Sequence, residues 1–174
     1  EYARQHLGRL MGLLIEDIGP GSSTQGDGAA RIRREMAQTP LQFESWDAAR
    51  AFWKASRPGL SEEGVESRLA HSMQERDGVI GWRHDQQGIA EARLSIEPTD
   101  LWPAVRSLDC PSLFIRGGRS DFLPPVMLQA MCASNPHVQA VEVADASHYV
   151  HDDQGEVFNR LVAGFLSGLV HAGQ

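Results

Sequence analysis

Two short apolar segments, each followed by a loop that carries one ionisable residue, constrain this sequence most. Residues 112–116 and 138–143 are apolar or alternate in polarity, and both patterns are typical of buried strands. Asp121 and His148 each come five residues after such a strand. The carboxyl ends of parallel strands share one edge of a sheet, so the two side chains should meet there. An acid and an imidazole so placed match the acid and the base of Ser-His-Asp catalysis, with the serine expected upstream.

The rest of the chain predicts an α/β fold with parallel strands and flanking helices. Residues 12–17 form a further apolar run, and helical patterns follow at 100–108, 124–133 and 154–169. We therefore divide the chain into 1–21, the end of a core helix and a strand; 22–98, a helical insertion; and 99–174, the α/β core that carries the acid and histidine loops.

The insertion is expected to be mainly helical. Ser45 or Asp47 can begin one helix and Ser61 can cap another, because their side chains accept hydrogen bonds from free backbone N–H groups. Asp77 and Gly78 predict a turn, followed by a brief extended piece at 79–85. Most of the large aromatic residues should form the core of this insertion, and some could line a substrate cleft; they are Trp46, Phe52, Trp53, Trp82 and Trp102.

Three weaker patterns remain as alternatives. Asp17 ends the first strand and is a second candidate for the acid that orients His148. His151 and the two aspartates that follow it lie near His148, but two histidines and a loop carboxylate are a weak metal signal. The Gly/Ser/Thr-rich loop at 21–30 resembles a phosphate cradle, yet it lacks the lysine that the Walker pattern requires.

A nucleophile is the part of the predicted site that this sequence does not supply. A nucleophile elbow needs Gly-x-Ser-x-Gly, and no serine here has glycine at both positions: Ser120 is followed at +2 by Phe122, and Ser22 lies between Pro20 and Thr24. No His-Gly-Gly segment offers an oxyanion hole either. Ester hydrolysis by these 174 residues alone should therefore be very slow.

The amino-acid composition excludes some classes of binding partner. The formal net charge is −7 and the pI is near 5.4, which argues against binding nucleic acid or an anionic membrane. Cys110 and Cys132 are the only cysteines, so we expect no disulfide framework, no metal site built on cysteines and a reducing, cytoplasmic setting. We also expect neither a metal nor a cofactor to take part in the chemistry. The longest apolar run, 161–170, is too short to span a bilayer, and no signal peptide is apparent.

The sequence resembles the C-terminal part of an α/β-hydrolase over nearly its whole length. Residues 13–20 are similar to the sixth strand and its Asp-Ile-Gly-Pro ending, 22–98 resembles the inserted cap, and 110–121 resembles the seventh strand with its acid loop. Residues 146–151 resemble the histidine loop, with Ser147 where glycine is usual. The resemblance implies Asp121 as triad acid and His148 as triad base, with the nucleophile in a region that would precede Glu1.

Two hypotheses follow. The first is an esterase-like hydrolase of small acyl compounds that needs its missing N-terminal half, a second chain or a homodimer. The second is a non-catalytic remnant that acts as a dimerising or ligand-binding module. A nucleotide-binding α/β protein is a third, weaker idea that rests on the glycines at 19–28.

Overall fold

The computed structural model describes residues 1–22, 27–95, 97 and 99–172. The chain divides into two compact units: one contains Glu1–Ala30 and Pro98–Gln174, and the other is Arg31–Glu97. No helix within the described residues is long and apolar enough to cross a membrane.

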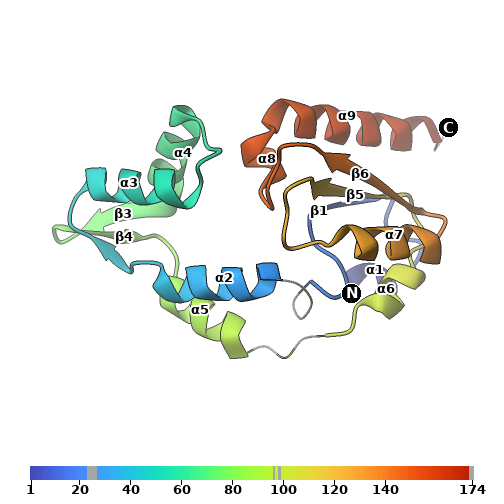
Figure 1. Ribbon diagram of the computed structural model, residues 1–174, viewed down its shortest axis with the longest axis horizontal. Helices are drawn as coiled ribbons and strands as arrows, with labels where there is room; N and C mark the ends of the chain where they lie inside the picture. The colour runs from blue at the N-terminus through green and yellow to red at the C-terminus, as the bar shows by residue number, and fades with distance from the viewer. Residues whose placement is uncertain (23–26, 96, 98, 173–174) are drawn as a thin grey trace. The chain divides into compact units, whose positions relative to one another are not determined.

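A three-stranded parallel sheet forms the centre of the first unit. Its order is β1 (Leu13–Glu16), β5 (Ser112–Gly117) and β6 (Val138–Val143). Three helices lie on one side of it, α1 (Tyr2–Gln5), α6 (Trp102–Arg106) and α7 (Pro125–Ser134), and two on the other, α8 (Val150–Asp153) and α9 (Gly155–Ala172) (Figure 1). The predicted fold class, parallel strands with flanking helices, is confirmed.

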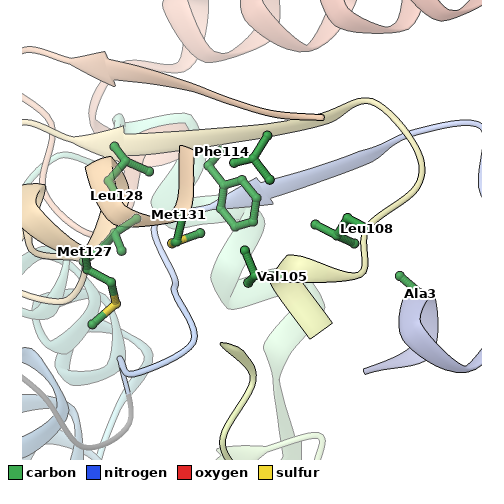
Figure 2. Packing of buried hydrophobic residues seen from close by; sticks show 9 residues of the cluster. Ala3, Val105, Leu108, Phe114, Met127, Leu128 and Met131 are labelled. Atoms are coloured by element: carbon green, nitrogen blue, oxygen red, sulfur yellow. The ribbon is translucent and has the colours of Figure 1, made fainter. Parts of the chain in front are cut away.

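Alternation along β5 builds a core on each face of this sheet. Phe114 points to the side of α6 and α7, where it packs with residues such as Met131 (Figure 2). Leu113 and Ile115 point to the other side, towards Val150 of α8. All six residues of β5 are buried, as expected for a parallel strand covered on both faces, and each large apolar side chain there contributes roughly 1.5–3 kcal/mol.

The strand β1 lies at an edge of the described sheet, because its only described partner strand is β5. Its four residues are only half-buried, unlike those of β5. A mainly apolar cavity of about 130 Å³ lies on the face of the sheet that α1 and α6 cover; its lining includes Leu13, Ile15, Val105, Leu108 and Phe114. Met11, two residues before the strand, is 72% exposed. A parallel strand with open apolar flanks is unusual, since such sheets are normally covered.

The second unit contains helices and a small antiparallel sheet. Its helices are α2 (Asp27–Gln38, which begins in the first unit), α3 (Trp46–Ser56), α4 (Glu62–Ser72) and α5 (Gln86–Ser95). The sheet has the order β2 (Gln42–Phe43), β4 (Val79–Trp82), β3 (Met73–Arg76).

Helices make up most of this unit, as expected of the insertion, and the small sheet adds strands to it. The brief extended piece predicted at 79–85 begins with β4, which pairs with β3 in a hairpin. Asp77 and Gly78 connect them with φ angles of 53° and 77°, and two consecutive positive φ angles are typical of the two-residue hairpin turn. The strand β3 was missed because Met73–Arg76 follows α4 without a break and has no apolar alternation to mark it.

Of the two predicted candidates for the start of α3, Ser45 is the cap and Asp47 is not, and the predicted cap Ser61 of α4 is confirmed. Ser45 accepts a hydrogen bond from the backbone of Ala48 at 3.1 Å, and Ser61 accepts one from Gly64 at 3.0 Å. The aromatic side chains of the unit pack together, with Phe43, Phe52, Trp53 and Trp82 in mutual ring contact. Two of the predicted members lie outside this aromatic core: Trp102 packs in the first unit, and Trp46 is 37% exposed.

Candidate active site

Asp17 is a fully buried acid at the end of β1. It follows the last residue of the strand and has a φ of 45°, a left-handed conformation that aspartate tolerates better than most residues. Its backbone N–H still donates to Ile115 of β5 at 2.8 Å, so the strand pairing holds the turn in place. The sharp turn directs the side chain across the carboxyl edge of the sheet.

Three donors converge on the Asp17 carboxylate. The backbone N–H of Gly117 donates to Oδ1 at 2.9 Å. The hydroxyl of Ser120 donates a short hydrogen bond to Oδ2, and Nδ1 of His148 lies 2.8 Å from the same oxygen. A buried carboxylate is costly unless its oxygens are hydrogen-bonded, and here both oxygens have donors.

His148 is held with one ring nitrogen bound and the other available. An ionised carboxylate only accepts hydrogen bonds, so Nδ1 is the nitrogen that carries the proton in this contact, and in the neutral imidazole Nε2 keeps its lone pair. None of the described residues hydrogen-bonds Nε2. The side chain is 19% exposed, and the rings of Phe122 and Tyr149 lie 4.4 and 4.9 Å from it, centroid to centroid. This is the geometry of a general base that is oriented through its far nitrogen.

The histidine loop packs directly on the end of β5. A β-carbon added to Gly117 would lie 1.9 Å from the carbonyl oxygen of Ser147, so only glycine allows this approach. The backbone of Arg119 donates to Ala146 at 2.9 Å, and the backbone of Ser147 donates to the carboxylate of Asp153 at 2.6 Å. These contacts hold the two loop residues that directly precede His148.

Asp121, the acid placed first by the sequence, lies in the same loop as Ser120 but is not the residue bonded to Nδ1. Its side chain is half-buried, and its backbone carbonyl accepts from Gly28 at 3.1 Å. The loop turns the hydroxyl of Ser120, one residue earlier, towards Asp17. The structure therefore brings His148 together with the alternative acid.

The two weaker predictions, a metal site around His151 and a phosphate-binding loop at 21–30, concern residues outside the His148–Asp17 pair. His151 contacts Glu16 through Nδ1 at 2.8 Å and Asp152 through Nε2 at 3.4 Å. Within the described residues, no group of three or more His, Cys, Asp or Glu side chains is arranged to hold a metal ion. Residues 23–26 of the glycine-rich loop lie outside the described residues.

Sequence reasoning did not identify Ser120 and Phe122 as parts of the site. Ser120 was considered only as a nucleophile and set aside for want of the glycine frame. Its use as a donor depends on the buried turn at Asp17, which no local pattern announces. The sequence did offer one signal: Ser120 and Phe122 are the direct neighbours of Asp121, in the loop that was already predicted to carry the acid.

Known proteins resemble the chain in sequence and in fold. No family model matches it. The sn-1-specific diacylglycerol lipase ABHD11 of Mus musculus is 25% identical over 158 residues, which cover 89% of this chain and 50% of that protein. Several other curated relatives are esterases.

Solved structures give the same picture. The chain superposes on E-2-(acetamidomethylene)succinate hydrolase with a TM-score of 0.82 at 21% identity, covering 95% of this chain and 60% of that one. It also superposes on an α/β hydrolase from Novosphingobium aromaticivorans with a TM-score of 0.67 at 26% identity, covering 84% and 53%. The chain spans about half the length of the curated relatives it matches most fully. Over its own length the chain therefore has the fold of the α/β hydrolases.

Proposed function

We propose that this chain supplies the base and its orienting acid to an α/β hydrolase that cleaves small carboxylic esters or related acyl compounds by a Ser-His-Asp mechanism. His148 is the base. Asp17, rather than Asp121, is the acid. The observation that carries the proposal is the 2.8 Å contact between Nδ1 of His148 and buried Asp17, which leaves Nε2 without a described partner.

In this mechanism Nε2 of His148 takes the proton of a serine hydroxyl as the serine attacks the ester carbonyl. The same nitrogen then donates the proton to the leaving alkoxide, and water repeats the sequence to release the acid. Asp17 stabilises the imidazolium that forms in each half and fixes the Nδ1–H tautomer. General base catalysis of this kind contributes roughly 10²–10⁴-fold to the rate. The proposed chemistry uses no metal and no cofactor.

The serine and the oxyanion donors would come from polypeptide outside these 174 residues. The open edge of β1, whose only described partner strand is β5, supports a further parallel strand at that position. The relatives are about twice as long as the matched region, which supports the same view. We propose that the partner is a polypeptide that carries the rest of the hydrolase fold, and not a nucleic acid or a membrane. We also propose that the protein acts in the cytoplasm.

The test is hydrolysis of p-nitrophenyl acetate and butyrate by the protein expressed from its complete gene, with native mass spectrometry of the same sample. His148→Ala should lower kcat by at least about 10³-fold, because both proton transfers are lost. His151→Ala is the matched control, three residues away and paired with Glu16 instead. It should keep the activity of the wild type.

Two results would contradict the proposal. Turnover that survives in His148→Ala would mean that another group acts as base. No turnover by the wild type with either ester, in a sample whose mass gives only this chain or its homodimer, would favour the alternative of a non-catalytic module.

A further inference from the structure

Arg116 is a buried cation on the central strand β5. Its side chain is 4% exposed, and the strand residues before it, Leu113, Phe114 and Ile115, are all core residues. Arg116 shares its face of the sheet with Phe114, where an apolar residue would continue the core. Burying a guanidinium costs several kcal/mol, and a well-packed apolar residue is often as stable or more so. The contacts of the guanidinium should therefore explain why an arginine stands at this buried position.

Those contacts are mainly with one loop. Nε donates to the carbonyl of Leu123 at 2.7 Å, Nη2 donates to that of Ser120 at 3.1 Å, and Nη1 donates to that of Gly118 at 3.3 Å. Nη1 also pairs with Glu142 of β6 at 2.6 Å, but this carboxylate is 54% exposed. The guanidinium thus uses all three nitrogens and holds residues 118–123 from the inside.

The loop that Arg116 holds also provides groups that surround Asp17 and His148. Ser120, whose carbonyl binds the guanidinium, donates its hydroxyl to Asp17. Phe122 lies between the two clamped carbonyls of Ser120 and Leu123, and its ring contacts the imidazole at 4.4 Å. The same Ser120 hydroxyl accepts a hydrogen bond from the backbone N–H of Phe122 at 3.0 Å, which ties the two residues to each other.

We propose that Arg116 is a positioning residue for the proposed base: it fixes the loop so that Ser120 holds the carboxylate of Asp17, and Phe122 holds the imidazole of His148, in the positions that allow their hydrogen bond. The inference rests on the proposed function of the His148–Asp17 pair. A rigid fork with several donors can bind three carbonyls of one loop at once, which explains why arginine rather than lysine or an apolar residue stands here.

The test follows the Nδ1 proton of His148 by NMR on protein with ¹⁵N-labelled histidine. In the wild type the hydrogen bond to Asp17 should give a downfield, slowly exchanging Nδ1–H signal, assigned by its loss in His148→Ala. Arg116→Met, which keeps bulk and removes every donor, should lose this signal or broaden it by exchange. Glu142→Gln is the matched control: it removes the ion pair, leaves the loop contacts, and should keep the signal.

Circular dichroism and thermal unfolding accompany each variant. A folded Arg116→Met that keeps the wild-type signal overturns the proposal. If Arg116→Met does not fold, Arg116→Lys decides: it keeps the charge but cannot bind three carbonyls, so a folded variant with the signal weakened supports the proposal and one with the signal unchanged overturns it. Absence of the signal in the wild type itself would instead contradict the proposed function.

Discussion

Asp17 and His148 are separated by 131 positions in the sequence and joined by a 2.8 Å hydrogen bond. The strand β5 makes this contact possible, because it pairs with β1 on one side and β6 on the other. Asp17 follows β1, and His148 lies in the loop after β6. Gly117, at the end of β5, donates to Asp17 and also lets the histidine loop approach.

Ser120→Ala should lower the free energy of unfolding by about 1–3 kcal/mol, because it leaves the buried carboxylate of Asp17 with one donor fewer. The same change removes the acceptor of the Phe122 N–H. Ser134→Ala is the control, since Ser134 is an exposed residue whose hydroxyl donates to the carbonyl of Met131 at the end of α7. Urea unfolding at neutral pH measures both, and equal losses would mean that the Ser120–Asp17 contact adds nothing.

Gly117→Ala should displace the histidine loop or destabilise the protein by about 3 kcal/mol or more, because the new β-carbon would meet the backbone of Ser147. Gly164→Ala is the matched control: nothing lies within 4 Å of the added carbon in α9, and alanine favours a helix by roughly 0.5–1 kcal/mol. Thermal unfolding should therefore shift in opposite directions. A Gly117→Ala variant as stable as the wild type would refute the close approach.

Cys132 should react slowly with iodoacetamide near pH 9. Burial raises the pKa of its thiol above the ordinary value, so the folded protein holds less thiolate than the unfolded chain at that pH. By the same linkage, this group lowers stability as the pH rises from the ordinary thiol pKa through the folded one. Peptide mapping of alkylation with and without urea measures the difference. Equal rates in both states would contradict the predicted shift.

Much of the core could be predicted from the sequence, because local patterns decide it. The run at 138–143 is β6 with the same bounds, and Ser45 and Ser61 cap helices as their chemistry suggests. Residues 1–10 were less predictable: the helix there extends only over Tyr2–Gln5, and Gly8, with a φ of 72°, lies beyond its end.

The choice of acid could not be read from the sequence. Asp17 and Asp121 both follow strands, and both remained candidates. Which of the two acids lies next to His148 depends on a left-handed turn at Asp17 and on the loop that Arg116 holds. Both are tertiary features. The strand β3 of the second unit was missed for a related reason, since pairing with β4 outweighs the weak strand propensity of Met73–Arg76.

The most direct test compares Asp17→Asn with Asp121→Asn by the Nδ1–H signal of His148 in ¹⁵N NMR. An amide in place of the Asp17 carboxylate must turn its NH₂ towards one of three donors, so the signal should be lost or moved far upfield in Asp17→Asn. It should persist in Asp121→Asn. The reverse pattern, a signal kept without the Asp17 carboxylate and lost without that of Asp121, would contradict the account and return the role of orienting acid to Asp121.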